Sequence, residues 1–178
     1  METRNTTVFS VSRDAFQAAL HLLGKENSPF LPQPFYSAGR GADTFLAGRN
    51  ELCEMGLAEL DFDGRISPTP AFARLLYDIT HAEAAIKLEQ PDRICWYLLA
   101  PTEMLYVEQE GDRVRLERRR AVSLLPWVRE ILLPAQAGTL TTQRGERLRK
   151  TELTPSSAGE EPRAKELTGH LAVFFGKE

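Results

Sequence analysis

The segment RICWYLLAPTEMLYVEQEGDRVRLERRR, residues 93–120, decides the fold of this chain. Its first part, residues 93–100, is apolar at almost every position, a pattern typical of a strand that is covered on both faces. Short turns separate it from two more strand-like runs, residues 104–109 and 113–120. The segment therefore predicts a three-stranded antiparallel meander at the centre of the core.

Charged and apolar residues alternate in the third run, so we expect Val114 and Leu116 to point inward and the arginines to point outward. The arginine face has two interpretations. It is a solvated face whose charges pair across the strands with Glu108, Glu110 and Glu117, or it is a binding surface for an acidic partner. The sequence leaves both open.

The meander leads into residues 123–134, where Ser123 is a candidate N-cap and apolar residues, Trp127 among them, recur at helical spacing. Pro126 fits the first turn of such a helix, because the N–H that proline lacks has no partner there. We expect this helix to pack on one face of the meander. Residues 91–134 are thus predicted to form an antiparallel β-meander packed by an apolar helix.

Residues 1–90 are predicted to form a helical module that contains one hairpin. Its elements are, in order, a helix over residues 9–23 capped by Ser12, a helix from Asp43 or Thr44 to Gly56, a hairpin over residues 57–67 with its turn at Asp63-Gly64, and a helix from Pro70 to about Leu88. This is the element order of a winged-helix module. A winged-helix DNA-binding regulator is therefore an alternative function.

The charges of this module argue against DNA as its partner. Residues 1–90 hold 8 basic and 12 acidic side chains, a net charge of −4, whereas residues 111–150 hold 10 basic and 4 acidic, a net of +6. The helix and wing that would contact DNA carry Glu51, Glu54, Asp61 and Asp63 among their charged residues. Because phosphate contacts dominate DNA affinity, we expect this module to be a packing unit.

The Pro-rich residues 27–41 also have two interpretations. The spacing of prolines keeps the segment extended, while its aromatic residues Phe30, Phe35 and Tyr36 need cover. Either the segment lies on the core of its own domain, or it is a loop that presents these aromatic side chains to a partner.

The tail, residues 135–178, is weakly defined by its sequence. Residues 138–153 fit a hairpin or a basic helix, residues 154–162 have the composition of a loop, and residues 164–175 fit a helix or a late strand. The predicted class is α+β, with segments 1–90, 91–134 and 135–178 forming one compact domain.

No pattern for catalysis, metal binding or a cofactor is found in the sequence. The three histidines are far apart, and no phosphate-binding loop or nucleophile motif is present. Cys53 and Cys95 lie in apolar segments outside any CxxC pair, which indicates reduced core thiols. The start of the sequence lacks a signal peptide, and no apolar run approaches the roughly 20 residues of a membrane helix. We expect a cytoplasmic protein that is not an enzyme, needs no cofactor and does not enter a membrane.

Several of these features together resemble one known family. The opening helix, LCEMGL at residues 52–57, the hairpin, PAFARLL at residues 70–76, the meander and LLPWV at residues 124–128 follow the order and hydrophobic pattern of the EspG-like chaperones of type VII (ESX) secretion and their Gram-positive counterparts. The likeness covers residues 8–134, roughly the first half of such a chaperone. The second sheet-and-helix half is expected to be mostly missing.

The resemblance implies a non-enzymatic protein that binds a small helical secreted protein and keeps it soluble until export. The candidate partner-binding residues are then the aromatic loop and the arginine face, namely Phe30, Phe35, Tyr36, Arg113, Arg115 and Arg119. A second copy of the same chain, giving a homodimer, is a further hypothesis for the partner.

Overall fold

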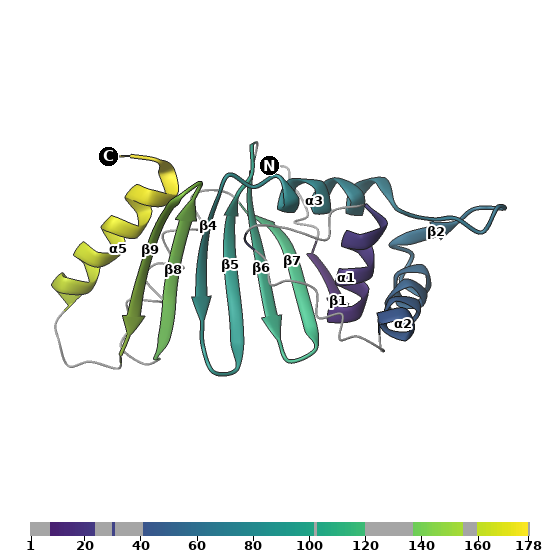
Figure 1. The fold of residues 1–178 in the computed structure, drawn as a ribbon, viewed down its shortest axis with the longest axis horizontal. Coiled ribbons are helices and arrows are strands. Elements are labelled where there is room, and N and C mark those ends of the chain that lie inside the picture. Colours follow the sequence, from purple (N-terminus) through teal and green to yellow (C-terminus); the bar gives the residue numbers. More distant parts are fainter. Residues whose placement is uncertain are drawn as a thin grey trace, which may run out of the picture.

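The computed structural model describes residues 8–23, 30, 41–101, 103–119, 137–154 and 160–177. Its centre is an antiparallel seven-stranded sheet with the strand order β1-β7-β6-β5-β4-β8-β9 (Figure 1). The strands of this sheet are β1 (Val8–Ser12), β4 (Ala84–Glu89), β5 (Arg93–Leu99), β6 (Met104–Glu110), β7 (Arg113–Arg119), β8 (Gly138–Arg144) and β9 (Arg147–Leu153). The α+β class is confirmed.

The other elements of the described residues are a separate hairpin and four helices. They are β2 (Ala58–Leu60) and β3 (Ile66–Pro68), which form the hairpin, and α1 (Arg13–Leu22), α2 (Gly41–Glu54), α3 (Pro70–Thr80) and α5 (Glu160–Phe175). None of these helices is long and apolar enough to cross a membrane.

The predicted meander is confirmed as strands β5, β6 and β7 of the large sheet. In its register Tyr97 lies opposite Tyr106, and Tyr106 lies opposite Glu117. Strand β5 is covered on both faces, as its apolar sequence predicted. Trp96 belongs to the core on one face and Tyr97 to the core on the other.

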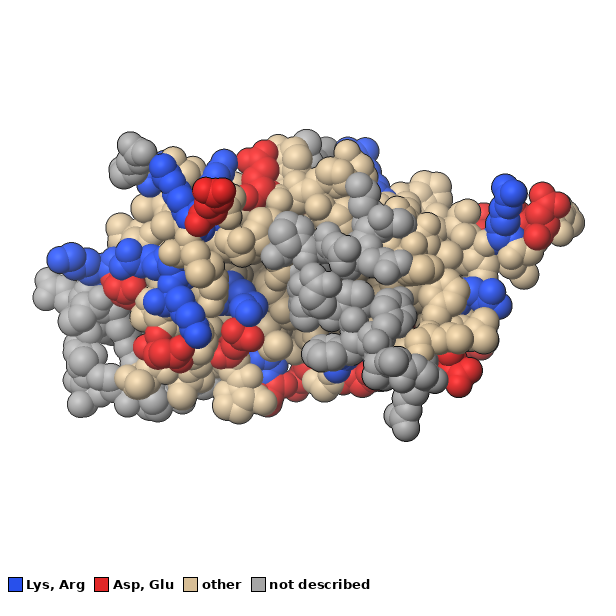
Figure 2. Space-filling view, viewed as in Figure 1, with Lys and Arg blue, Asp and Glu red and all other residues tan. Residues whose placement is uncertain are grey.

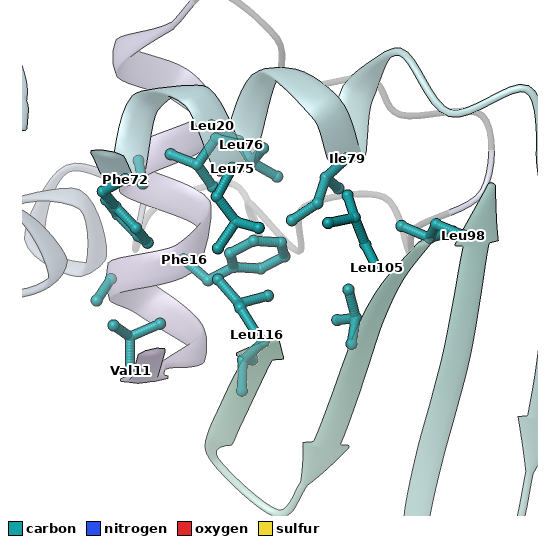
Figure 3. Close-up of a cluster of buried hydrophobic side chains, with 14 of the residues drawn as sticks. Val11, Phe16, Leu20, Phe72, Leu75, Leu76, Ile79, Leu98, Leu105 and Leu116 are labelled. Carbon is teal, nitrogen blue, oxygen red and sulfur yellow. The ribbon is translucent and has the colours of Figure 1, made fainter. Parts of the chain in front are cut away.

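The first core lies where α1 and α3 cover strands β5, β6 and β7 (Figure 3). Phe16 of α1 and Leu75 and Ile79 of α3 pack there on alternate strand residues such as Leu105 and Leu116. These positions recur at helical spacing in the helices and at a spacing of two in the strands, so each element turns one apolar side to the other. Each such buried side chain contributes about 1.5–3 kcal/mol to stability.

The second core lies on the opposite face of the sheet, at its other end. Leu167 and Phe174 of α5 pack there in a cluster that includes Ile86, Leu88 and Leu140. The sheet is therefore covered by α1 and α3 on one face and by α5 on the other (Figure 1). The face of β7 that is turned away from α1 and α3 carries Arg113, Arg115 and Arg119.

Two of the predicted helices were too long. The helix expected to run to about Leu88 ends at Thr80, and residues 84–89 form β4 between β5 and β8. A short apolar run fits a buried strand as well as a helix, and pairing on both sides here favours the strand. The helix predicted over residues 9–23 begins only at Arg13, because Phe9 lies in β1. Ser12 caps this helix as predicted, and its Oγ accepts a hydrogen bond from the Ala15 N–H at 3.0 Å.

Several boundaries of the remaining elements are also settled. Helix α2 begins at Gly41, so Asp43 lies in its first turn and the predicted cap at Asp43 or Thr44 is wrong.

The tail forms the hairpin β8–β9 and helix α5. Of the alternatives that the sequence left open, the hairpin therefore holds for residues 138–153 and the helix for residues 164–175. The predicted helix over residues 123–134 lies outside the described residues. The winged-helix likeness and the division into three segments stay predictions.

Candidate partner-binding surface

The predicted arginine face lies on β7, the neighbour of the edge strand β1. Val114 and Leu116 are buried in the first core, as predicted. Arg113, Arg115 and Arg119 alternate with these apolar residues and so extend from the opposite face of the sheet.

Arg113 and Arg115 are largely exposed. The side chain of Arg113 keeps 59% of its accessible area, and its Nη1 lies 3.6 Å from Oε1 of Glu51 on α2. The side chain of Arg115 keeps 47%, and its Nη2 lies 3.2 Å from Oε2 of Glu117. Ion pairs at such exposure contribute only about 0–1 kcal/mol, so both guanidinium groups are available to a partner at little cost.

Arg119, in contrast, is built into the protein. Its guanidinium lies 3.9 Å from the ring centre of Tyr106 and 5.6 Å from that of Tyr97, and it donates hydrogen bonds to the Tyr97 hydroxyl and to Glu117. Burial opposes its charge, but the hydrogen bonds to Glu117 and Tyr97 outweigh burial and raise the pKa of Arg119. Arg119 therefore positions Glu117 and the two rings and is not a free contact residue.

The predicted cross-strand partners of the arginines are only partly found. Glu117 pairs with both Arg115 and Arg119, but all three residues lie on β7, so these pairs run along the strand and not across it. Glu108 instead accepts a hydrogen bond from the Tyr106 hydroxyl, which also lies 3.3 Å from Sγ of Cys95. Burial raises the pKa of the Cys95 thiol and of the Tyr106 hydroxyl, so both stay protonated at neutral pH. A protonated, buried thiol is a structural residue and not a nucleophile.

The aromatic loop and the arginines do not form one surface in the part that the structure describes. Phe30 is half-buried and packs against the first core, on the α1 and α3 side of the sheet. Arg113 and Arg115 extend from the other side. Phe35 and Tyr36 lie outside the described residues. Phe30 therefore packs on its own domain, and its role as a contact for a partner stays a prediction.

The three histidines lie in unrelated environments. The His21 ring packs edge-to-face with Phe45, His81 stacks on Tyr77, and His170 of α5 is buried. Within the described residues, no group of three or more His, Cys, Asp or Glu side chains is arranged to hold a metal ion. Cys53 and Cys95 are free thiols, as predicted.

Two features were missed by the sequence reasoning. One is a polar cluster under α5, in which His170 contacts two threonines and Thr151 donates a hydrogen bond to Glu166 at 2.6 Å. Its members are far apart in the sequence, so no local sequence pattern predicts this cluster. The other is Phe62, at the tip of the β2–β3 hairpin and fully exposed. An aromatic residue between two aspartates in a predicted turn was a signal for it.

Comparison with solved structures gives an informative likeness of fold. No protein-family model matches the sequence, and no curated protein matches it significantly. The fold is similar to that of the type VII secretion system chaperone EspG5 of Mycobacterium tuberculosis, whose structure was determined in complex with the PE25–PPE41 dimer. The TM-score is 0.60 at 8% sequence identity, and the match covers 97% of this chain and 98% of that chain. The expectation that the likeness stops near residue 134 is therefore wrong, because the folds correspond almost throughout.

Proposed function

We propose that this chain is a non-enzymatic chaperone of type VII secretion, which binds a small helical secreted protein in the cytoplasm and keeps it soluble until export. The observation that carries the proposal is the likeness of the whole fold to EspG5, a chaperone of that system that binds a protein dimer. The order of helices and strands predicted from the sequence resembles that of the same family.

Arg113 and Arg115 are the proposed contacts for acidic groups of the partner. Both are exposed, and the carboxylate that Arg115 contacts is shared with Arg119. A partner carboxylate would therefore meet cationic groups that are not fully neutralised, which favours encounter and fixes orientation. From the sequence, Phe35 and Tyr36 are proposed as apolar contacts. Arg119 is proposed to hold Glu117 in place beside Arg115, while Phe30 packs on the other face of the sheet and is not part of the arginine surface.

The test is complex formation with helical substrates of type VII secretion encoded in the same genome. Size-exclusion chromatography with light scattering is expected to show a stable complex whose mass is the sum of its components. The double variant Arg113→Glu/Arg115→Glu is expected to weaken binding about tenfold or more, because each change replaces attraction by repulsion. Lys150→Glu, on the exposed side of β9, is the matched control and is expected to bind normally.

Two results would contradict the proposal. One is the absence of a complex with every helical substrate tested. The other is tight binding to duplex DNA whose affinity falls steeply with salt, which is the behaviour of a winged-helix regulator. Glu51 of α2 already accepts a hydrogen bond from the Ser12 N–H at 2.8 Å and contacts Arg113, so this helix is committed to its own domain.

A further inference from the structure

The β2–β3 hairpin stands apart from the large sheet. It forms a two-stranded sheet of its own, and it projects from the end of the molecule beyond α2 (Figure 1). Its base is fixed by a 2.8 Å hydrogen bond from the Thr69 N–H to the carbonyl of Leu57. Leu57 packs partly buried against the first core, so the hairpin is anchored in the domain at one end and free at the other.

The tip of the hairpin is held in one conformation by Asp61. Its Oδ1 accepts hydrogen bonds from the N–H groups of Asp63 at 3.0 Å and Arg65 at 2.7 Å. The Asp61 N–H also donates a hydrogen bond to the Arg65 carbonyl, and the Asp61 carbonyl accepts one from the Gly64 N–H. Gly64 takes the positive φ of +78° that the turn requires. An isolated hairpin this short is marginal by itself, and these bonds order the loop before any partner arrives.

The ordered tip presents bare apolar side chains. Phe62 is fully exposed, at 111% of its reference area, and Leu60 keeps 63%. Large apolar groups exposed together are characteristic of interaction sites, and a rigid loop loses little entropy when it binds.

The charges around Phe62 define the chemistry of its partner. Glu59, Asp61 and Asp63 are exposed in the same hairpin, together with the basic Arg65. Figure 2 shows acidic and basic side chains together at this projecting end of the molecule. The net negative charge disfavours nucleic acid and anionic lipid surfaces. It favours an apolar pocket or stripe that is bordered by lysine or arginine.

We propose that the β2–β3 hairpin is a docking finger that inserts Phe62 into an apolar stripe on a helical segment of a partner protein, where basic residues border the stripe. The helical character of the partner rests on the proposed function. The position of the contact and its charge follow from the hairpin itself. The finger lies apart from Arg113 and Arg115, so the two surfaces select different charges on the partner.

The test uses a fluorescein-labelled amphipathic helical peptide of leucine and lysine, with its leucine–glutamate counterpart as the charge control. Fluorescence anisotropy with the full chain is expected to show binding of the leucine–lysine peptide and at least about tenfold weaker binding of the leucine–glutamate peptide. Phe62→Ala is expected to weaken binding of the first peptide about tenfold, as truncation of an aromatic anchor does. Leu148→Ala is the control, because Leu148 on β9 has the same 63% exposure as Leu60.

Failure of the leucine–lysine peptide to bind, equal binding by Phe62→Ala and the parent chain, or equal binding of both peptides would overturn the proposal. Self-association that depends on Phe62 in light scattering would overturn it too, because the occupant would then be a second copy. The result is separable from the proposed function. If a secretion substrate binds the parent chain and Phe62→Ala equally well, the finger is wrong and the chaperone role stands.

Discussion

Nδ1 of His170 on α5 lies 2.7 Å from Oγ1 of Thr142 on β8, and Nε2 of the same ring lies 2.9 Å from Oγ1 of Thr151 on β9. One imidazole thus ties the last helix to both strands of the terminal hairpin. The ring is fully buried. Burial, with a smaller effect of nearby Arg149, lowers the pKa of His170 from 6.5 to about 4.

The stability of the fold is therefore predicted to fall with acid. Because the folded pKa of His170 is depressed, the unfolded chain binds the extra proton between pH 6.5 and about 4, and stability declines as the pH falls through that range. Between pH 7.5 and 5 the free energy of unfolding is expected to drop by about 2 kcal/mol from this residue alone. Urea denaturation at both pH values measures the drop.

The variant His170→Asn isolates this contribution. It is expected to be less stable at neutral pH but to lose about 2 kcal/mol less on acidification, because asparagine does not titrate. Hydrogen bonds from Arg149 and Thr151 lower the pKa of Glu166 below 4.5, so its stabilising charge is lost only at still lower pH. An unchanged pH dependence in His170→Asn would show that the histidine is not the sensor.

Arg118 is predicted to be the most important ion-pair residue of β7. On the face opposite to Arg119, its Nη2 lies 2.7 Å from Oδ2 of Asp78 on α3 and its Nη1 lies 2.9 Å from Oε2 of Glu103. Asp78 is buried, so Arg118→Met would leave a carboxylate without its cation. We expect a loss of about 2–3 kcal/mol in the free energy of unfolding, measured by chemical denaturation.

Two companion variants sharpen that test. Arg115→Met, on the same strand but exposed, is expected to cost less than about 1 kcal/mol. The double variant Asp78→Asn/Arg118→Met is expected to recover part of the loss, because no buried charge remains. If Arg118→Met and Arg115→Met lowered the free energy of unfolding equally, burial of the Arg118–Asp78 pair would not contribute to stability.

Gly48 is predicted to be essential for the contact between α1 and α2. A Cβ atom at this position would lie 2.2 Å from the Asp14 carbonyl oxygen and 2.7 Å from the Ala15 nitrogen, both backbone atoms that a rotamer change does not move. Gly48→Ala is therefore expected to cost about 3 kcal/mol, despite the better helix propensity of alanine. Asn50→Ala, at an exposed position of α2, is the control and is expected to be neutral or slightly stabilising in thermal unfolding.

Asp61 is predicted to order the hairpin tip through its acceptor oxygen and not through its charge. Asp61→Ala is expected to speed hydrogen exchange of the Asp63 and Arg65 N–H groups, with little change in the unfolding temperature because the tip is exposed. Asp61→Asn keeps an acceptor oxygen and is expected to retain most of the protection. Exchange in Asp61→Ala as slow as in the parent chain would assign the order to the backbone turn alone, and exchange in Asp61→Asn as fast as in Asp61→Ala would assign it to the charge of Asp61.

Local signals in the sequence were sufficient for much of the fold. The meander, the Ser12 cap, the Asp63-Gly64 turn and the start of α3 at Pro70 each depend on neighbouring residues, and the structure has all of them. The pairing of β1 with β7 and of β4 with β8 joins distant segments. Nothing local distinguishes β4 from the end of a helix, because its short apolar run suits either.

The candidate surface was predictable only in part, for the same physical reason. Alternation along β7 located the exposed Arg113 and Arg115, which is a local pattern. The stacking of Arg119 on Tyr106, and the engagement of Glu51 by Arg113, depend on tertiary neighbours. The partners of a charged residue therefore became known only once the strands and α2 were placed.

The most direct test of the proposed chaperone role is isothermal titration calorimetry of the full chain with a purified helical type VII secretion substrate from the same genome. The account predicts saturable binding with a dissociation constant of about 1 μM or tighter and a negative heat-capacity change, since apolar surface is buried. It also predicts that the Arg113→Glu/Arg115→Glu variant binds about tenfold more weakly. No detectable heat with any such substrate, or equal affinity in the parent chain and the double variant, would contradict it.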